Sequence, residues 1–246
     1  MAILEICAGS IDSVIAAQRG GATRVELCSA LEIGGTTPSA GIIAEARKIE
    51  GITLNVLIRP RGGDFLYNTH EAECMIEDIR ICKAIGADGV VIGALTADGN
   101  IDTALCHCLI TAAEGMSITF HRAFDVCKEP QRALEDIIAL GCNRILTSGQ
   151  APTAAEGTEL LKELITQADE RIIIMPGCGV NSNNAAKIIE ATGAAEIHAS
   201  ARKKADSGML FRHKGVSMGS STYDEYSHNE TCEEEVRKIV TGISCL

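Results

Sequence analysis

Aromatic residues and long apolar runs are scarce in this chain of 246 residues, which has no tryptophan and only 3% aromatic residues. Its core must therefore be built from aliphatic side chains, alanine and cysteine. No apolar run approaches the roughly 18 residues of a membrane-spanning helix, so we expect no membrane partner. The amino-terminal MAILEICAG lacks the basic segment of a signal peptide, which predicts a cytoplasmic protein. A net charge of −11 argues against nucleic acid as the main partner.

The cysteines lack the spacing of a zinc site or of a disulfide framework, and their number, 11, is odd. Cys106 and Cys108 flank His107, but this segment has a helical pattern that places the two sulfurs on different faces. We interpret most cysteines as small core hydrophobes of a reducing cytoplasm. Cys7 and Cys28 are exceptions, for the reasons given below.

Strand and helix patterns alternate regularly along the chain. Short β-branched runs predict strands at Ile3–Cys7, Arg24–Cys28, Thr53–Ile58, Gly89–Ile92, Ser117–His121, Arg144–Thr147, Ile172–Met175 and Glu196–Ala199. Amphipathic stretches predict helices near Ser10–Arg19, Ser39–Glu50, Thr69–Ile85, Asp102–Ala113, Pro130–Leu140, Ala154–Ala168 and Asn183–Ala191. Plausible N-caps are Ser10, Ser39, Thr69 and Asp102.

This alternation predicts an α/β fold, a (β/α)8 TIM barrel in a single domain over residues 1–201. Four segments support it, because GGATRVEL, IGADGVVI, LGCNRILT and TGAAEIHA each have a glycine that ends a helix, a short turn and a strand. An open doubly wound sheet is the alternative, but no GxGxxG dinucleotide motif is present.

The segment 202–246 departs from the alternation, and we expect a C-terminal loop and helix that pack on the barrel. Arg202 to Asn229 is polar and rich in glycine and serine, and a helix is predicted at Glu230–Val240 with Asn229 as its cap. Met209, His213 and Met218 could be soft metal ligands. An ordered loop or a contact between subunits of a homo-oligomer is the favoured interpretation.

Ionisable residues recur at alternate positions near the carboxyl ends of the predicted strands, where barrel enzymes build their sites. Because the helix layer is apolar, these side chains are expected to point into the barrel. The inward set is Glu5, Cys7, Glu26, Cys28, Asn55, Arg59, Thr119, His121, Glu196, His198 and Ser200. Each desolvated charge is costly unless it is paired, so the pattern favours a functional pocket over a purely structural network. Glu5 or Glu26 is expected to pair with an arginine.

The segment Thr53–Leu66, TLNVLIRPRGGDFL, ends a buried strand by presenting two guanidinium groups beside a pair of glycines. Guanidinium forks suit carboxylate or phosphate, so Arg59 and Arg61, with Arg122, are predicted to hold a small anion. Two glycine-containing loops could add backbone donors, one with Ser148 and the other with Gly177 and Gly179 before a helix.

Several motifs together resemble the CutC family: GGATRVELCSAL, GGTTPS, IRPRGGDFLY, FHRAFD, LTSGQ and IMPGCGVN. The resemblance covers Leu4 to about Met218 and implies a TIM barrel with a role in copper homeostasis. Copper(I) prefers sulfur ligands, and Cys7 and Cys28 both fall in the family's motifs and point toward the site, so the resemblance implies that they bind it. Cys178 departs from the family pattern, which has glycine there.

Two other functions stay open at this point. A barrel enzyme could use Glu5, Glu26 and His121 for proton transfer while Arg59, Arg61, Arg122, His198, Ser148, Gly177 and Gly179 bind a small anionic metabolite. A non-catalytic homo-oligomeric scaffold is the third interpretation. The fold alone cannot choose among them, because this barrel hosts many chemistries.

Overall fold

The computed structural model describes residues 2–213, 215–216 and 224–244. Eight parallel strands form the centre: Ile3–Ala8 (β1), Arg24–Leu27 (β2), Thr53–Leu57 (β3), Gly89–Ile92 (β4), Ser117–Phe120 (β5), Arg144–Thr147 (β6), Ile173–Pro176 (β7) and Glu196–Ala199 (β8). The helices between them are Ile11–Arg19 (α1), Ala40–Arg47 (α2), Thr69–Ile85 (α3), Thr103–Ala112 (α4), Pro130–Ala139 (α5), Thr158–Ala168 (α6) and Ala185–Thr192 (α7). Two short 3-10 helices, Leu31–Ile33 (η1) and Arg122–Val126 (η2), follow β2 and β5.

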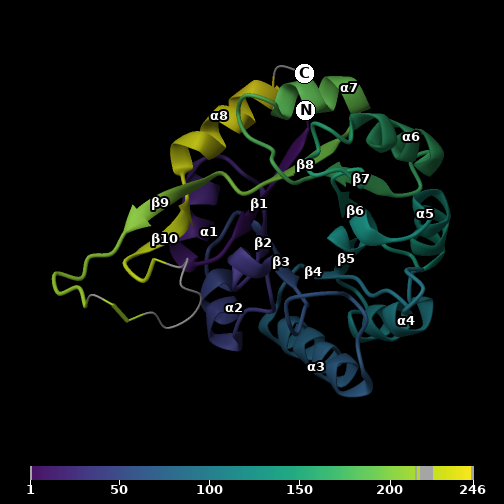
Figure 1. The fold of residues 1–246 in the computed structure, drawn as a ribbon, viewed down its shortest axis with the longest axis horizontal. Helices are drawn as coiled ribbons and strands as arrows, with labels where there is room; N and C mark the ends of the chain where they lie inside the picture. Colours follow the sequence, from purple (N-terminus) through teal and green to yellow (C-terminus); the bar gives the residue numbers. More distant parts are fainter. Residues whose placement is uncertain (1, 214, 217–223, 245–246) are drawn as a thin grey trace.

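Strand pairing follows the chain, and the predicted TIM barrel is confirmed. The hydrogen-bonded order is β7-β6-β5-β4-β3-β2-β1-β8, so β7 and β8 end the order, and they contact each other to close the ring (Figure 1). Parallel register places Glu5 opposite Arg24 on one side and His198 on the other. The residues that the pattern placed inward therefore become direct neighbours.

The main apolar core lies between the strands and the helices. Strands such as β2 and β4 are buried along their whole length, and the largest fully buried side chains include Phe120 and Phe124. Each helix turns an apolar stripe inward, as α5 does with Ala133, Leu134 and Ile137. Burial on both faces is the reason that the strands read as continuous apolar runs.

One expected helix cap and one expected helix start are wrong. The cap of α3 is Asn68, not Thr69, because Asn68 and Glu71 bond to each other's backbone N–H groups in a capping box. The α6 helix begins at Thr158 rather than Ala154. The Ala154 N–H group donates to the Cys178 carbonyl at 3.0 Å, which ties this segment to the loop after β7.

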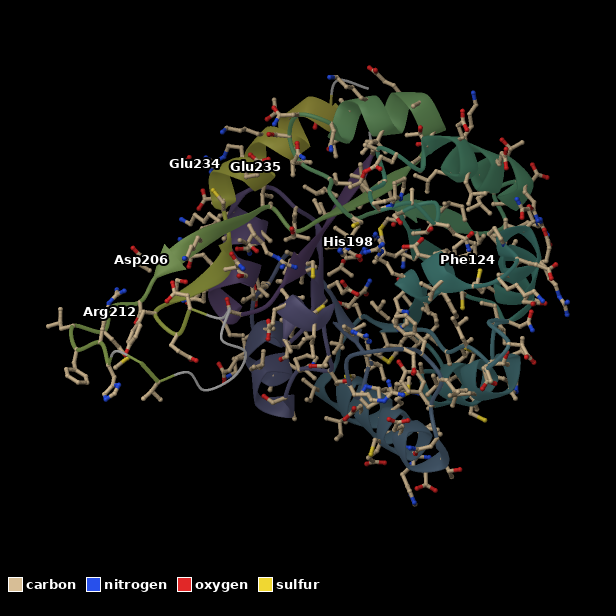
Figure 2. All side chains as sticks on the ribbon, viewed as in Figure 1. Phe124, His198, Asp206, Arg212, Glu234 and Glu235 are labelled. Atoms are coloured by element: carbon tan, nitrogen blue, oxygen red, sulfur yellow. The ribbon has the colours of Figure 1, made fainter. Side chains whose placement is uncertain are left out.

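The tail contains a hairpin where a loop was expected. Arg202–Asp206 (β9) and Ser227–Thr231 (β10) pair antiparallel, and Asn229 lies opposite Lys204, so Asn229 does not cap the last helix. That helix is Glu233–Ser244 (α8), and it buries Val236, Ile239 and Ile243 against the barrel. The hairpin extends away from the barrel, as Asp206 and Arg212 show in Figure 2.

The sequence singled out three residues of the tail as soft ligands. Met209 and His213 are exposed on the hairpin, whereas Met218 lies outside the described residues. Along the described chain, no helix is both long and apolar enough to cross a membrane.

Candidate functional site

A layer of paired charges crosses the interior of the barrel below the strands' carboxyl ends. The Glu5 carboxylate accepts a bond from Arg24 Nε at 2.5 Å, and Arg24 also pairs with Glu196. Arg144 Nε bonds to the same Glu196 carboxylate at 3.0 Å. The expected pairing of an inward glutamate with an arginine is therefore found. The sequence interpretation did not identify the arginines of these ion pairs, Arg24 and Arg144, although both occupy inward-facing positions of their strands.

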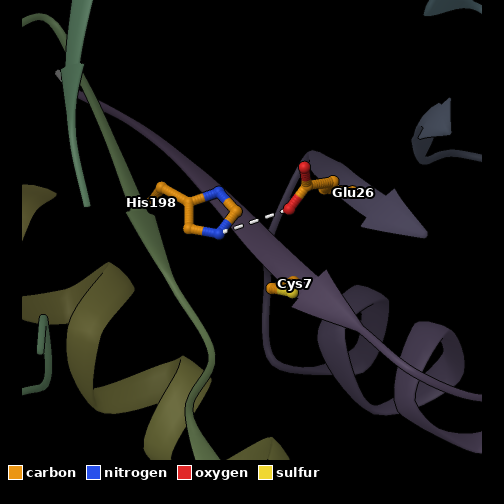
Figure 3. A group of neighbouring side chains, drawn as sticks. All are labelled: Cys7, Glu26 and His198. Carbon is orange, nitrogen blue, oxygen red and sulfur yellow. Dashed lines mark ion pairs between the residues drawn. The ribbon is translucent and has the colours of Figure 1, made fainter. Parts of the chain in front are cut away.

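His198 connects this charge layer to the pocket above it. Its Nδ1 atom lies 2.9 Å from Glu5 Oε1, and its Nε2 atom lies 3.6 Å from Glu26 Oε2 (Figure 3). Ligand atoms of Cys7, Glu26 and His198 all lie within 4.8 Å of one another, and all three residues are buried. They come from β1, β2 and β8, which the barrel order makes neighbours.

The surroundings of this cluster set its charges. Burial raises the pKa of Glu5, but the hydrogen bond with His198 and the charge of Arg24 outweigh burial and lower the pKa to about 2. Burial acts to lower the pKa of His198, but its hydrogen bonds with Cys7 and Glu5 raise it well above the usual value. Burial, and then the charge of Cys7, raise the pKa of Glu26 to about 8. These shifts favour the ionised form of Glu5 and the protonated forms of His198 and Glu26.

Cys7 and Cys28 form a sulfur pair, with their Sγ atoms 3.8 Å apart. The hydrogen bond from Cys28 lowers the pKa of Cys7 well below its usual range, and His198 lowers it further. Burial and the same hydrogen bond raise the pKa of the Cys28 thiol. The shared hydrogen bond therefore favours the thiolate form of Cys7 and the thiol form of Cys28. The pair packs against Leu57, Val91 and Leu31.

Arg59 is buried in the loops above β3, and its guanidinium bonds to backbone carbonyl groups rather than to the inward glutamates. Its Nη1 atom donates to the carbonyls of Ile33 and Gly35, and its Nη2 atom donates to the Gly63 carbonyl at 2.7 Å. Carbonyl oxygens of three loop residues therefore accept hydrogen bonds from both terminal nitrogens of this guanidinium.

Arg61 lies outside the pocket, which corrects the expected three-sided arginine clamp. Its Nε atom bonds to Glu71 at 2.6 Å, and its Nη2 atom bonds to Asp64 at 3.0 Å. These contacts hold the loop before α3. Because Arg61 lies beyond the strand, after Pro60, the sequence interpretation assigned it to ligand binding. In the structure its guanidinium already bonds to Asp64 and Glu71.

Arg122 and Ser148 share one hydrogen-bond network, which depends on Asp125. Arg122 donates to Asp125 Oδ2 at 2.6 Å and to Ser148 Oγ at 3.2 Å. Asp125 also accepts bonds from the Thr147 hydroxyl and the Ser148 N–H group. The sequence interpretation missed Asp125, although it closes the FHRAFD motif. Ser148 therefore positions Arg122 and is not among the residues that line the pocket.

The loop after β7 places Gly177, Cys178 and Gly179 near His198. A Cβ at Gly177 would lie 2.4 Å from Leu146 Cδ1 and 3.2 Å from His198 Cβ, so glycine lets the loop pass close to both side chains. Gly179 lines the pocket with a φ of +72°, and Cys178 lies beside it with a φ of +80°, a region that disfavours side chains. The α7 helix begins only at Ala185, so this loop is not the helix N-terminus that we expected to bind an anion.

One pocket of about 310 Å³ gathers these groups at the carboxyl ends of the strands. The sulfur pair, Glu26 and His198 line it, together with Arg59, Phe65 and His121. Arg122, Arg202, Cys178 and Gly179 complete the polar lining. Of the predicted site residues, the structure brings Cys7, Cys28, Glu26, His121, His198, Arg59, Arg122 and Gly179 to this pocket. It places Glu5, Arg61, Ser148 and Gly177 outside the lining.

Comparison with known proteins agrees with this architecture. The family model described as the CutC family matches residues 2–203. A family protein CutC from Chromobacterium violaceum is 53% identical over 237 residues, which is 96% of each chain. The copper homeostasis protein cutC homolog of Homo sapiens is 49% identical over 238 residues, covering 96% of this chain and 87% of that protein.

Among solved structures, a CutC protein from Streptococcus agalactiae matches with a TM-score of 0.79 and 37% identity. The match covers 81% of this chain and 99% of that one. Sequence and structure therefore agree that this chain belongs to the CutC family.

Proposed function

We propose that the protein binds copper(I) through Cys7 and Cys28 and acts in copper homeostasis. The observation that carries the proposal is the sulfur pair, 3.8 Å apart at the wall of the pocket. Metal–thiolate bonds of roughly 2.3 Å, as zinc forms, allow one ion to contact both atoms at this separation. The name of the human relative, a copper homeostasis protein, supports the same metal.

The chemistry of the donors fits copper(I) better than harder ions. Soft thiolates select copper(I), whereas oxygen ligands suit magnesium and calcium. Cys7 is already poised as a thiolate by its hydrogen bond with Cys28. Leu57 and Val91 pack against the pair and limit its contact with water. Binding the metal to both sulfurs would release the Cys28 proton.

Neighbouring groups can balance the charge that such a complex carries. Two thiolates and one copper(I) ion sum to a single negative charge. His198 is protonated beside Cys7, and the positive charge of Arg202 also acts on Cys7. His198 can in addition serve as a third donor once it loses a proton, because its ring lies within the same cluster.

The proton-transfer roles considered for an enzyme are less well supported. Glu5 is fixed by Arg24, Asn55 and His198, and its low pKa leaves it a weak base. Burial and the charge of Arg59 lower the pKa of His121 to about 3, so it too is a weak base at neutral pH. Copper binding by the sulfur pair does not require Glu5 or His121 to transfer a proton. Reduced thiols also require a reducing compartment, and we propose a cytosolic location for this reason.

Anaerobic copper(I) titration against a competing chelator tests the proposal. The test variant is Cys7→Ser/Cys28→Ser, and the matched control is Cys74→Ser/Cys108→Ser, which changes two exposed cysteines. Loss of outer-shell groups alone costs about 10- to 100-fold in metal affinity, so loss of both ligands should cost at least about 100-fold. The control should keep the wild-type affinity. If the test variant also keeps it, the sulfur pair is not the copper site.

A further inference from the structure

Two buried donors in the wall of the pocket have no acceptor among the described residues. They are Arg59 Nε and His121 Nε2, on side chains that are 5% and 4% exposed. Both residues line the 310 Å³ pocket. Buried polar groups are nearly always hydrogen-bonded, so two unpartnered donors in one pocket point to a ligand that supplies acceptors.

The hydrogen bonds of His121 fix which nitrogen carries its proton. The Ala123 N–H group donates to His121 Nδ1 at 3.1 Å, so Nδ1 must be the unprotonated nitrogen. Burial, together with the charge of Arg59, lowers the pKa of His121 to about 3 and keeps the ring neutral. The single ring proton therefore lies on Nε2, which makes this atom a donor.

Packing holds both donors in place before any ligand arrives. The Phe65 ring lies 5.0 Å from Arg59 Cζ and 4.9 Å from the centroid of the His121 ring, so one aromatic side chain supports both. Gly93 makes room for the imidazole, because a Cβ there would lie 2.4 Å from His121 Nδ1. Three carbonyl bonds fix the other nitrogens of Arg59. A site built in this way loses little entropy when it binds.

The charge of the lining indicates an anion. Arg59, Arg122 and Arg202 line the pocket, and Glu26 is the only carboxyl group among the described lining residues. Two single N–H donors match the two oxygens of a carboxylate. A phosphate would gain from a helix N-terminus, but α7 begins six residues after Gly179.

We propose that Arg59 Nε and His121 Nε2 bind the carboxylate of a small organic acid in this pocket. Phe65 and Leu57 offer apolar surface to the rest of such a molecule. The proposal goes beyond copper binding, since it uses different atoms and requires no metal. It also replaces the expected Arg61 contact with a donor from His121.

NMR of the metal-free, reduced, full-length protein tests the proposal without any mutation. The nitrogen-15 resonances of the His121 ring are followed while acetate, succinate or inorganic phosphate is added at constant ionic strength, with chloride as the reference salt. We expect a saturable change at Nε2 with acetate and succinate. A weaker response, or none, is expected with phosphate and chloride.

Calorimetry with succinate then compares matched variants. Arg59→Lys keeps the charge but removes the Nε–H group, and His121→Phe keeps a ring against Phe65 but removes the donor. Each should weaken binding about 10- to 100-fold, as expected for a hydrogen bond to a charged group. Arg61→Lys makes the same exchange two positions away, outside the pocket, and should change the affinity less than about twofold.

The proposal is overturned if no carboxylate perturbs His121 in the wild type, which would leave water as the acceptor. It is also overturned if phosphate binds more tightly than every carboxylate, or if Arg61→Lys weakens succinate as much as Arg59→Lys does. These experiments contain no copper, so none of their outcomes bears on whether Cys7 and Cys28 bind copper.

Discussion

Two histidines in the same pocket are held in opposite charge states by their neighbours. Burial acts to lower the pKa of His198, but its hydrogen bonds with Cys7 and Glu5 outweigh burial and raise it. His121 faces Arg59 and Phe65 instead, so burial and a positive charge act together and lower its pKa. One imidazole can thus stabilise the thiolate, while the other remains a neutral donor.

The neutral state of His121 predicts a pH dependence of folding. In the folded protein its pKa is about 3, against 6.5 for an ordinary histidine. Between these values the unfolded chain binds a proton that folded His121 does not, so the free energy of unfolding falls as pH falls below 6.5. The expected contribution is up to about 1.4 kcal/mol per pH unit.

Urea unfolding of the metal-free protein at pH 7, 6 and 5 checks this dependence. The wild type should lose stability more steeply than His121→Phe, because titration of the other groups cancels in the comparison. Parallel pH profiles for the two proteins would contradict a buried neutral histidine.

Which residues face the pocket could be predicted from strand parity, but their partners could not. Cys7, Glu26, His121 and His198 were placed correctly because side chains alternate along a strand. Arg24 and Arg144 lie at the starts of their strands, whereas sites in such barrels lie at the carboxyl ends, so the pattern did not single them out. Which arginine a buried carboxylate reaches depends on register between strands, which a single sequence does not specify.

At the scale of secondary structure, α8 anchors the tail to the first strand–helix unit. Gly20, at the end of α1, approaches α8 so closely that an added Cβ would lie 2.5 Å from Val236 Cβ and 2.9 Å from the Glu233 carbonyl. Its φ of −73° suits any residue, so the requirement for glycine is steric alone. Gly242, within α8, has open space around its missing side chain.

These two glycines predict opposite effects of the same substitution. Gly20→Ala should lower the free energy of unfolding by about 1–3 kcal/mol, because it overpacks the contact between α1 and α8. Gly242→Ala should raise it by about 0.5–1 kcal/mol, since alanine favours an exposed helix interior. Urea denaturation of both variants measures the difference. Equal effects would mean that α8 does not pack closely against α1 in solution.

The existence of α8 was predictable, whereas the hairpin before it was not. Val236, Ile239 and Ile243 recur at helical spacing, which marks a buried face. The β9 strand, RKKAD, has almost no apolar alternation, and four of its five residues are exposed. Its pairing with β10 comes from the backbone ladder and from ion pairs such as Lys203 with Glu230. Polar strands of this kind resemble loops in sequence.

At the scale of the whole molecule, the buried charges hold the barrel closed. The hydrogen-bonded strand order ends at β7 and β8, which contact each other at the closure. Glu196 on β8 bonds to Arg144 on β6 and to Arg24 on β2, and Arg24 continues to Glu5 on β1. The network therefore connects strands on both sides of the closure and supports the pocket through Glu5 and His198.

Removing Arg24 should test this role most directly. Arg24→Met keeps an apolar side chain of similar length but leaves Glu5 and Glu196 each without one cationic partner in a buried site. Breaking a buried ion pair from one side costs about 3–5 kcal/mol, and we expect a loss of this size in urea unfolding. The matched control, Arg80→Met, removes an exposed pair with Glu77 and should cost no more than about 1 kcal/mol. Hydrogen exchange should accelerate in β8 of Arg24→Met, because Glu196 loses a tie across the barrel. If Arg24→Met costs no more than the control and β8 exchanges at the wild-type rate, closure depends on apolar packing and the charges serve the pocket alone.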